Sequence, residues 1–474
     1  MSSPSSQLHR RRLLAGILPA AACCAGSQVA AAGAHNVSGS PPAVVTVSGD
    51  GSQDQTDQLQ QAVEQTGGGV FLQGTIRISK PVVLELDRIG TRSIFGDGSA
   101  RLIMSGPGPA FRLIGTHHGT AAPHTVKPNV WERQRMPCLD GFSIDGEHEQ
   151  ACGIEAVKTM GMVLTRLHVR HCHHAVHLRE RNRNFIIQAC HFYDNRGIGV
   201  YYDHVDLHQS NIGDSHISYN AGGGVVSRGG NVRNIHIGNC DLEGNHPPKD
   251  SPASAATANI LIDCRRSQYG TAEVAITGCT IQHTRNSPDS ANIRILGRSD
   301  IHREGHVTIT GNVFSDVQTN VHLSSVRGAT ITGNTFWQGF THNLLIEDSA
   351  EIAIGSNNLN RNPRYAHSRF GHIRHEVLIR NSRDVTICGL VLNGVRQTEG
   401  GLRLQKCRRI VVNGCTLGDC DGPPLRLQQC EGVVVQGCVI GDPQREDAVA
   451  VRADECGRIE LAGNIVYGKV VKPA

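Results

Sequence analysis

The sequence predicts an all-β protein, built as a parallel β-solenoid of about a dozen coils with a short helix capping its N-terminal end. Three observations support this fold class. A motif recurs along most of the chain, each repeat holds short alternating runs of β-branched residues, and the composition is rich in Gly (54 residues) but poor in aromatic residues (4%). Repeats this small cannot bury an apolar face alone, so they must stack and share one core.

The repeats are clearest after about residue 160. Segments such as Val274–Cys279, Val307–Asn312 and Val433–Cys438 align, and the residue that closes each segment recurs mostly every 22 to 26 positions. Leucine-rich repeats have a similar period, but their Leu-rich consensus and helical half are missing, and ankyrin or TPR repeats would require amphipathic helices. A parallel β-solenoid is the architecture that remains.

The cysteines follow the same period. One column holds Cys and Asn at the closing position and a second column holds Cys alone: Cys190, Cys240, Cys279, Cys415 and Cys438 with Asn312, Asn334, Asn357 and Asn464, then Cys407, Cys430 and Cys456. Residues in one column lie about one strand spacing apart, so Asn side chains can form hydrogen-bonded ladders and Cys can fill the same small slot. We expect buried structural thiols, with disulfides or a metal site as the alternatives.

Residues 1–34 have the pattern of an export signal. His9–Arg12 precede a short apolar run, and Ala32–Ala34 supply small residues for cleavage near Ala34. The arginines followed by two Leu residues resemble a twin-arginine signal, while an ordinary secretory signal and a lipoprotein modified at Cys23 are the alternatives. The apolar run is too short to span a membrane.

This organisation predicts an exported protein, periplasmic or extracellular, with a linker at 35–42, the solenoid at 43–468 and a C-terminal tail at 469–474. The net charge of +4 and the lack of a basic run in the body of the chain argue against a nucleic-acid partner. Only seven of the 46 basic residues are Lys. Arg forks bind carboxylates bidentately, so we expect an acidic partner, namely an acidic polysaccharide. We also expect the protein to be a monomer.

A short helix is predicted before the first repeats. In Gly49–Val63, Asp54 or Thr56 can cap a helix with an apolar stripe, and a Gly-rich strand follows at Gly67–Gly74. These two strings closely resemble the N-terminal signature of the pectate lyase superfamily of right-handed parallel β-helix proteins. The resemblance, with the repeats, covers roughly residues 43–468. It implies a polysaccharide-related β-helix but no single reaction, because the superfamily includes lyases, hydrolases, epimerases and inert relatives.

The chain also departs from better-defined members of that superfamily. The Asp-Asp pair and Gly-His-Gly motif of polygalacturonase-like hydrolases are missing, and the nearest string, Phe370–Ile373, lacks the closing Gly. Pectate lyases hold calcium through clustered acidic residues, which are not evident here, so no cofactor is assigned and calcium stays an open alternative. Tyr201, Asp203 and His204 are loosely similar to a catalytic grouping of alginate C5-epimerases, with altered spacing.

Strand alternation points independently to the same residues. The second strand of each coil aligns as Val176–Arg179, Val200–Asp203, Val225–Arg228, Ile260–Asp263 and onward. Alternate side chains of these strands point outward. One exposed face would therefore carry His177, Arg179, Tyr201, Asp203, Arg228, Asp263, Arg294, His322, Glu347, Arg380, Arg403 and Arg426. In the stretch that contains Asp203, Tyr202 is expected to point inward, and Asp206 and His208 to belong to the following turn.

This Arg-rich face suits chemistry on uronic-acid sugars. Removing the proton beside a carboxylate requires a base and neutralisation of the carboxylate charge. Arg228 and Arg179 could neutralise, Tyr201 or His204 could act as base or acid, and Asp203 could share a proton with the substrate if burial raised its pKa. We predict the catalytic set Tyr201, Asp203, His204, Arg228 and Asp263, and the substrate-binding set His177, Arg179, Arg294 and His322.

Two alternatives stay open. A glycoside hydrolase would use Asp203 and Asp263 as acid and base, two coils apart at roughly 9 to 10 Å. A non-catalytic polysaccharide-binding or structural solenoid would carry the same charges as solvated cross-strand pairs. The dense histidines at 168–177 do not repeat a known ligand spacing, so no metal site is predicted.

Overall fold

The structure, a computed structural model, describes residues 44–247, 258–283, 287, 289–298, 304–361 and 373–472. The predicted export signal, the linker and most of the Phe370–Ile373 string lie outside these residues. No helix in the described part of the chain is long and apolar enough to cross a membrane.

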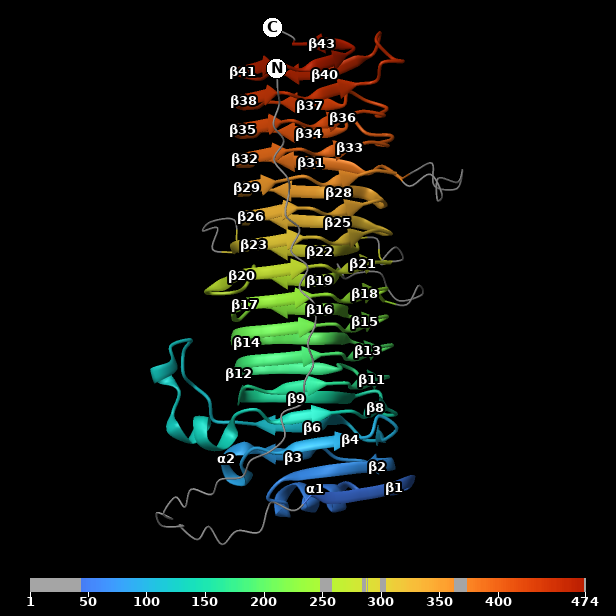
Figure 1. Cartoon of the computed structure of the whole chain (residues 1–474), viewed down its shortest axis with the longest axis vertical. Helices are drawn as coiled ribbons and strands as arrows, with labels where there is room; N and C mark the ends of the chain where they lie inside the picture. Colours follow the sequence, from blue (N-terminus) through green and yellow to red (C-terminus); the bar gives the residue numbers. More distant parts are fainter. Residues whose placement is uncertain are drawn as a thin grey trace, which may run out of the picture. The chain divides into compact units, whose positions relative to one another are not determined.

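The described strands wind into a parallel β-helix, in which each strand pairs with the equivalent strands of the coils before and after it (Figure 1). The pairings form three ladders along the stack, which we call ladders 1, 2 and 3. Parallel stacking leaves one side chain of each aligned set directly above the next, at about one strand spacing (~4.8 Å). The long strands β12 and β14 contribute to both ladder 1 and ladder 2.

Ladder 1 carries the predicted exposed face. It contains β3 (Val82–Glu85), β6 (Gly108–Ile114), β9 (Ala151–Met160), β12 (Val176–Gln188), β14 (Ile198–Gly213), β16 (Gly223–Arg228), β19 (Ala258–Asp263), β22 (Ala291–Leu296), β25 (Val317–Ser324), β28 (Gly339–Glu347), β31 (Glu376–Arg380), β34 (Leu402–Gln405), β37 (Leu425–Gln428), β40 (Val449–Asp454) and β43 (Lys469–Val471).

Ladder 2 follows ladder 1 in each coil. Besides the second halves of β12 and β14 it contains β1 (Val45–Asp54), β2 (Gly69–Ile78), β4 (Ser93–Gly96), β7 (Cys138–Asp140), β10 (Val163–Thr165), β17 (Asn231–Gly238), β20 (Gly270–Thr277), β23 (Gly305–Thr310), β26 (Arg327–Thr332), β29 (Ala350–Ile354), β32 (Arg383–Cys388), β35 (Arg408–Asn413), β38 (Glu431–Gln436) and β41 (Ile459–Ala462).

Ladder 3 consists of short strands and completes each coil. It contains the end of β2, then β5 (Arg101–Met104), β8 (Ser143–Gly146), β11 (His168–Arg170), β13 (His191–Tyr193), β15 (His216–Ser218), β18 (Asp241–Glu243), β21 (Thr280–Gln282), β24 (Val313–Phe314), β27 (Thr335–Phe336), β30 (Asn358–Leu359), β33 (Val391–Leu392), β36 (Thr416–Leu417), β39 (Val439–Gly441) and β42 (Ile465–Tyr467).

Helices are short and lie near the N-terminal coils. The helix expected before the repeats is α1 (Thr56–Gln65), and its buried Leu59, Ala62 and Val63 lie in the same core as the strands. Helix α2 (Leu86–Ile89) follows β3. Between β6 and β7 the chain leaves the coil as an excursion over residues 115–137, which includes a 3-10 turn (Pro123–Thr125) and a π-helical turn (Val130–Gln134).

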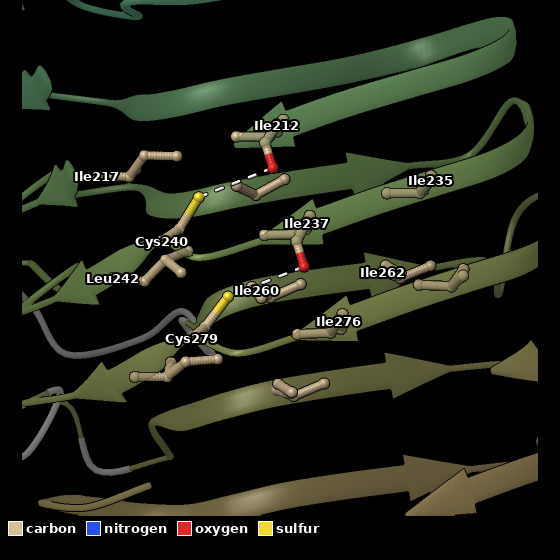
Figure 2. Close-up of a cluster of buried hydrophobic side chains, with 14 of the residues drawn as sticks. Ile212, Ile217, Ile235, Ile237, Cys240, Leu242, Ile260, Ile262, Ile276 and Cys279 are labelled. Atoms are coloured by element: carbon tan, nitrogen blue, oxygen red, sulfur yellow. Dashed lines mark hydrogen bonds between the residues drawn. The ribbon is translucent and has the colours of Figure 1, made fainter. Parts of the chain in front are cut away.

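Isoleucine, valine and leucine from all three ladders fill one continuous core, and cysteines occupy the corners of it. Figure 2 shows Cys240 and Cys279 one coil apart among Ile side chains, with their thiols directed at the carbonyls of Ile212 and Ile237 at 3.8 Å. Every cysteine in the described part of the chain is unpaired, and most are buried. The prediction of buried structural thiols is therefore confirmed for the cysteines of the two predicted columns except Cys456, which is only partly buried.

Asparagine ladders cross the coils in two columns. In the predicted column, Asn312 donates to Asn334 and Asn334 to Asn357, each at 3.0 Å. A second column, which the repeat alignment missed, runs through Asn195, Asn220, Asn245, Asn259, Asn292, Asn320 and Asn343 at 2.7 to 2.8 Å per step. Because these amides are fully buried or nearly so, each link satisfies polar groups that would otherwise be costly.

Two sequence predictions about local structure are wrong. Asp206 and His208 do not form a turn but continue β14, which bends at His204 (φ 46°) and then pairs with β17 in ladder 2. The predicted tail begins with a strand, β43, which pairs with β40. Tyr202 does point inward as predicted, fully buried with its hydroxyl 2.6 Å from that of Ser210.

Candidate functional site

The register of ladder 1 places the predicted site residues on neighbouring coils. Arg179 of β12 lies opposite Asp203 of β14, Asp203 opposite Arg228 of β16, and Arg228 opposite Asp263 of β19. These strand pairings are the ones that the alignment of the sequence repeats predicted. Opposite charges therefore alternate along one edge of ladder 1, where each strand ends.

Asp203 is the centre of a hydrogen-bonded cluster. One carboxylate oxygen lies 2.9 Å from His177 Nε2 and the other 2.8 Å from His204 Nδ1. Burial works to raise the pKa of Asp203, but the hydrogen bonds from His204 and His177 outweigh it, and the net shift is downward. Asp203 is therefore ionised at neutral pH, and the predicted role in which it shares a proton with the substrate is not supported.

Tyr201 packs against the same cluster. Its ring stacks on the His177 imidazole with centroids 5.2 Å apart and planes 7° from parallel, and the Arg228 guanidinium carbon lies 6.0 Å from the ring centroid. Burial and the neighbouring Asp203 carboxylate raise the pKa of Tyr201. The hydroxyl therefore carries its proton at neutral pH.

Histidines behind Tyr201 complete the packing. His174 lies with its ring centroid 5.2 Å from that of Tyr201, and its Nδ1 accepts the backbone N–H of Ile198 at 3.0 Å. Burial lowers the pKa of His174 to about 3, so this ring stays neutral. The far side of His177 faces Glu155 of β9, with Nδ1 3.8 Å from the carboxylate.

A basic hollow of about 630 Å³ lies beside the cluster, and we call it the reaction hollow. It is lined by His204, Arg228, Gly229, Leu261, Asp263, Arg265, Arg266 and Leu296. Asp263 is bound by both ends of the Arg265 fork at 2.8 and 2.9 Å. Burial works to raise the pKa of Asp263, but the hydrogen bonds from Arg265 outweigh it, and the net shift is downward. This carboxylate is therefore ionised as well.

Two guanidinium groups in the reaction hollow are left without an acidic partner. Within the described residues, neither Arg228 nor Arg266 forms an ion pair, although both line the hollow. With His204 at the rim, the hollow presents uncompensated positive charge to the solvent. Such a surface favours an anionic ligand, and planar guanidinium forks favour a carboxylate.

A second basic hollow lies on the other side of Asp203, toward the N-terminus. It measures about 400 Å³ and is lined by Arg112, Ile114, Gly115, Thr116, His118, Glu155, Val157, Lys158, Arg179 and Glu180. The excursion over residues 115–137 forms part of its wall. The predicted Arg179 lies here rather than in the reaction hollow, with Nη1 3.5 Å from Glu155.

The structure corrects two predictions for the rest of the exposed face. Arg294 is only 2% exposed, where it donates to His322 Nδ1 at 3.1 Å and to Asp289 at 2.7 Å, and Glu347 is 8% exposed. His322 in turn lies 2.8 Å from Glu347, which also binds Arg380. These residues bind one another across coils, so Arg294 is not available as a substrate contact. Both ring nitrogens of His322 already have partners, Arg294 and Glu347.

Part of the outer face of ladder 1 is covered by apolar side chains. Ile198, Val226, Ala258, Leu261 and Ala291 form a second apolar cluster on that face, with Tyr201 and Leu296 packed against it. Alternation predicts which side of a strand a residue lies on, but it does not predict whether that side is open to solvent.

Three residues that carry the site were missed by the sequence reasoning. Arg265 and Arg266 follow the end of β19 after one intervening residue, and the signal that could have found them is the pair of arginines at a strand end. Glu155 precedes the region of clear repeats, so the alignment did not reach it. Its register with His177 in β12 is visible only in the structure.

Metal ligands do not assemble. No group of three or more His, Cys, Asp or Glu side chains among the described residues could hold a metal ion. The carboxylates of ladder 1 are bound by arginines and histidines instead, which leaves calcium no acidic cluster there. His168, the first of the dense histidines at 168–177, lies in ladder 3. Its ring stacks on that of His191, with the ring centroids 5.2 Å apart.

Fold and site together define a right-handed parallel β-helix with a polar face and a basic hollow. The model "Right handed beta helix region" matches residues 142–264, and the model "Periplasmic copper-binding protein (NosD)" matches residues 254–435. Each covers less than half of the chain. No curated protein matches.

Solved structures match over most of the chain at low identity. Tailspike protein 3 (TSP3, orf212) of bacteriophage CBA120 is 13% identical, with a TM-score of 0.50, over 90% of this chain and 60% of that one. A double mutant of the tailspike protein of E. coli bacteriophage HK620 is 9% identical, with a TM-score of 0.52, over 88% of this chain and 76% of that one. This chain therefore spans about 60% of the length of the first structure, and these similarities show the fold alone.

The copper in the description of the matched family was tested against the residues present. Residues 254–435 contain no Met, and the described part of the chain contains no cluster of metal-ligating side chains. The thiols of Cys407 and Cys415 donate to backbone carbonyls at 3.3 and 3.7 Å. Among the described residues no set of soft ligands assembles, so the residues do not fit a copper site.

Proposed function

We propose that this chain is an exported β-helix protein that acts on a uronic-acid-containing polysaccharide, as a lyase or a C5-epimerase. The observation that carries the proposal is the pair of guanidinium groups without acidic partners, Arg228 and Arg266, in a hollow that His204 also lines. Tyr201 lies against Arg228, and Asp203 is hydrogen-bonded to His204. The resemblance of the N-terminal strings to the pectate lyase superfamily and the word "periplasmic" in the description of the matched family support the substrate class and the export.

The proposed base is His204. Asp203 is an ionised carboxylate that accepts a hydrogen bond, so it selects the His204 tautomer with the proton on Nδ1. Nε2 then has a free lone pair at the rim of the reaction hollow. Asp203 acts here as the residue that orients the base, as carboxylates do in acid–base dyads.

The proposed acid is Tyr201, whose raised pKa keeps its proton at neutral pH. His204 takes the proton from the carbon that bears the carboxylate, and Arg228 and Arg266 stabilise the negative charge that moves into the carboxylate. In elimination this electron pair forms a C=C bond, the glycosidic C–O bond breaks, and Tyr201 protonates the leaving oxygen. In epimerisation the glycosidic bond stays and a proton returns to the opposite face of the carbon.

The hydrolase alternative is weaker on these observations. An inverting hydrolase requires one protonated carboxyl group and one ionised carboxylate. The pKa values of Asp203 and Asp263 are both lowered, and Asp263 is held by a bidentate Arg265. Neither residue is placed to act as the acid.

The test is to incubate the purified protein with pectate, alginate and glycosaminoglycans. A lyase gives the ultraviolet absorbance of unsaturated products, and an epimerase incorporates deuterium from D₂O without chain cleavage. New reducing ends without unsaturation would replace the proposal with hydrolysis. Binding without any product would replace it with a non-catalytic binding protein.

A pair of variants tests the assignment of the base. His204→Gln should lower kcat by roughly 10²- to 10⁴-fold, because the general base is lost. The matched control is His216→Gln, an exposed histidine of ladder 3 that also faces a carboxylate, Asp241, at 3.5 Å. Full activity in His204→Gln, or equal losses in both variants, would remove His204 from the mechanism.

A further inference from the structure

A third basic hollow lies far along the stack, near the C-terminal coils. It measures about 530 Å³ and is lined by Arg383, Arg408, Arg409, Glu431, Gly432 and Arg458. We call it the distal hollow. The residues come from the starts of the ladder 2 strands β32, β35 and β38, and from the residue before β41.

The charges of the distal hollow are not balanced within the protein. Arg383 and Arg409 share one carboxylate, Asp384, at 2.7 and 2.5 Å. Arg408 and Arg458 are exposed, and their side chains have no hydrogen bond or ion pair with any described residue. Two guanidinium forks therefore project from coils two apart without an ion pair, and Glu431, on the coil between them, is the one acidic residue in the lining.

Both hollows lie along one edge of the stack, where ladder 1 ends and ladder 2 begins. Asp263, at the reaction hollow, is followed in register by Leu296, Ser324, Glu347, Arg380 and Gln405. Arg265 comes two residues after Asp263, and Arg408 comes three residues after Gln405. Five coils thus separate the two hollows, roughly 24 Å at about 4.8 Å per coil.

We propose that the distal hollow is a second binding site for the polyuronate chain whose other end occupies the reaction hollow. This inference rests on the proposed function and adds a chain-length dependence to it. A polymer that spans five coils engages both sites at once, and the second contact is intramolecular, so it raises the affinity without a change in chemistry. A chain of two or three sugars reaches only the reaction hollow.

The lining argues for a polyuronate rather than another polyanion. No aromatic side chain lines the hollow, so it offers no platform for the bases of a nucleic acid. No apolar side chain lines it either, so it offers nothing to insert into a lipid surface. The planar forks of Arg408 and Arg458, two coils apart and so roughly 10 Å at about 4.8 Å per coil, match carboxylates that repeat along a chain. The exposed Asp348 lies on the same edge between the two hollows.

The test compares Arg408→Ala/Arg458→Ala with the wild type in binding to polymeric pectate or alginate and to the corresponding di- and trisaccharides. We expect the double variant to bind the polymer about tenfold more weakly, equal to about 1.4 kcal/mol, and to bind and convert the short chains as the wild type does. The matched control is Lys80→Ala/Arg135→Ala, which removes the same charge from exposed residues outside the hollows.

Each outcome decides the inference. Unchanged polymer affinity in Arg408→Ala/Arg458→Ala, or an equal loss in the Lys80→Ala/Arg135→Ala control, would overturn the second site and leave the proposed function intact. A loss of binding to phosphatidylglycerol vesicles with unchanged polyuronate binding would assign the hollow to lipid and overturn the inference. A wild type that binds no polyuronate of any length would overturn both the inference and the proposed function.

Discussion

Acid should loosen the excursion over residues 115–137 through one buried histidine. His117 is 1% exposed, and neither of its ring nitrogens has a hydrogen-bond partner. Burial, and then the nearby Arg181 and Arg183, lower the pKa of His117 to about 4. Arg183 also donates to the carbonyl of Thr120, so the same arginine holds the excursion against ladder 1.

The size and sign of the effect follow from this pKa. His117 is neutral in the folded state, whereas in an opened state its pKa returns to about 6.5. The opened state therefore gains a proton as the pH falls below 6.5, and stability is lost progressively toward pH 4. At pH 5 the loss is about 1.8 kcal/mol relative to pH 7, equal to roughly a 20-fold rise in the opened population.

Hydrogen exchange of peptides from residues 115–137 at pH 7 and pH 5, corrected for intrinsic rates, measures this opening. The variant His117→Leu should lose most of the pH dependence, since no group is left to titrate. His118→Gln, a change at the exposed neighbour, should keep it. The reasoning is refuted if His117→Leu and the wild type show the same pH dependence.

Three further predictions concern the core, the acid and the thiols. Asn220→Ala removes three buried hydrogen bonds and should lower the free energy of unfolding in urea by about 2 to 4 kcal/mol. The control Asn211→Ala, at an exposed position of β14, should lower it by less than about 0.5 kcal/mol. Equal losses in both variants would show that the asparagine ladder does not stabilise the fold. Tyr201→Phe should abolish product formation by a lyase while polymer binding persists, because only the hydroxyl is lost; retained turnover would remove Tyr201 as the acid. Burial raises the pKa of Cys190 to about 12, so iodoacetamide should label the partly exposed Cys388 well before Cys190, and the reverse order would contradict the buried thiol column.

The pairing of ladder 1 was predictable because a solenoid imposes one register on every coil. Aligning Val176, Val200, Val225 and Ile260 by their inward position gave the partners that the structure has. The Asn312 column was found for the same reason. The Asn220 column was missed because its members do not occupy the closing position of the repeat, and inserted segments vary the spacing between them.

Exposure was harder to predict than register. Arg294 occupies an outward position of β22, yet it is buried and donates hydrogen bonds to His322 on the next coil and to Asp289. The direction of the Asp203 pKa shift could not be read from the sequence either. It depends on His177 approaching from one coil and His204 from the same strand, and only their distances decide which effect prevails.

These observations indicate where a ligand site should be sought in such a fold. Stacking repeats the outward charges at one spacing, so most acids and bases pair across coils, as His322 does with Glu347. Paired charges stabilise little at an exposed surface and are poor evidence for function. The residues that indicate a ligand site are the charged residues that have no ion-pair partner. In the described part of the chain, Arg228 and Arg266 are left over at one hollow and Arg408 and Arg458 at another, on one edge of the stack, and this shared edge is the reason to assign both hollows to one polymer.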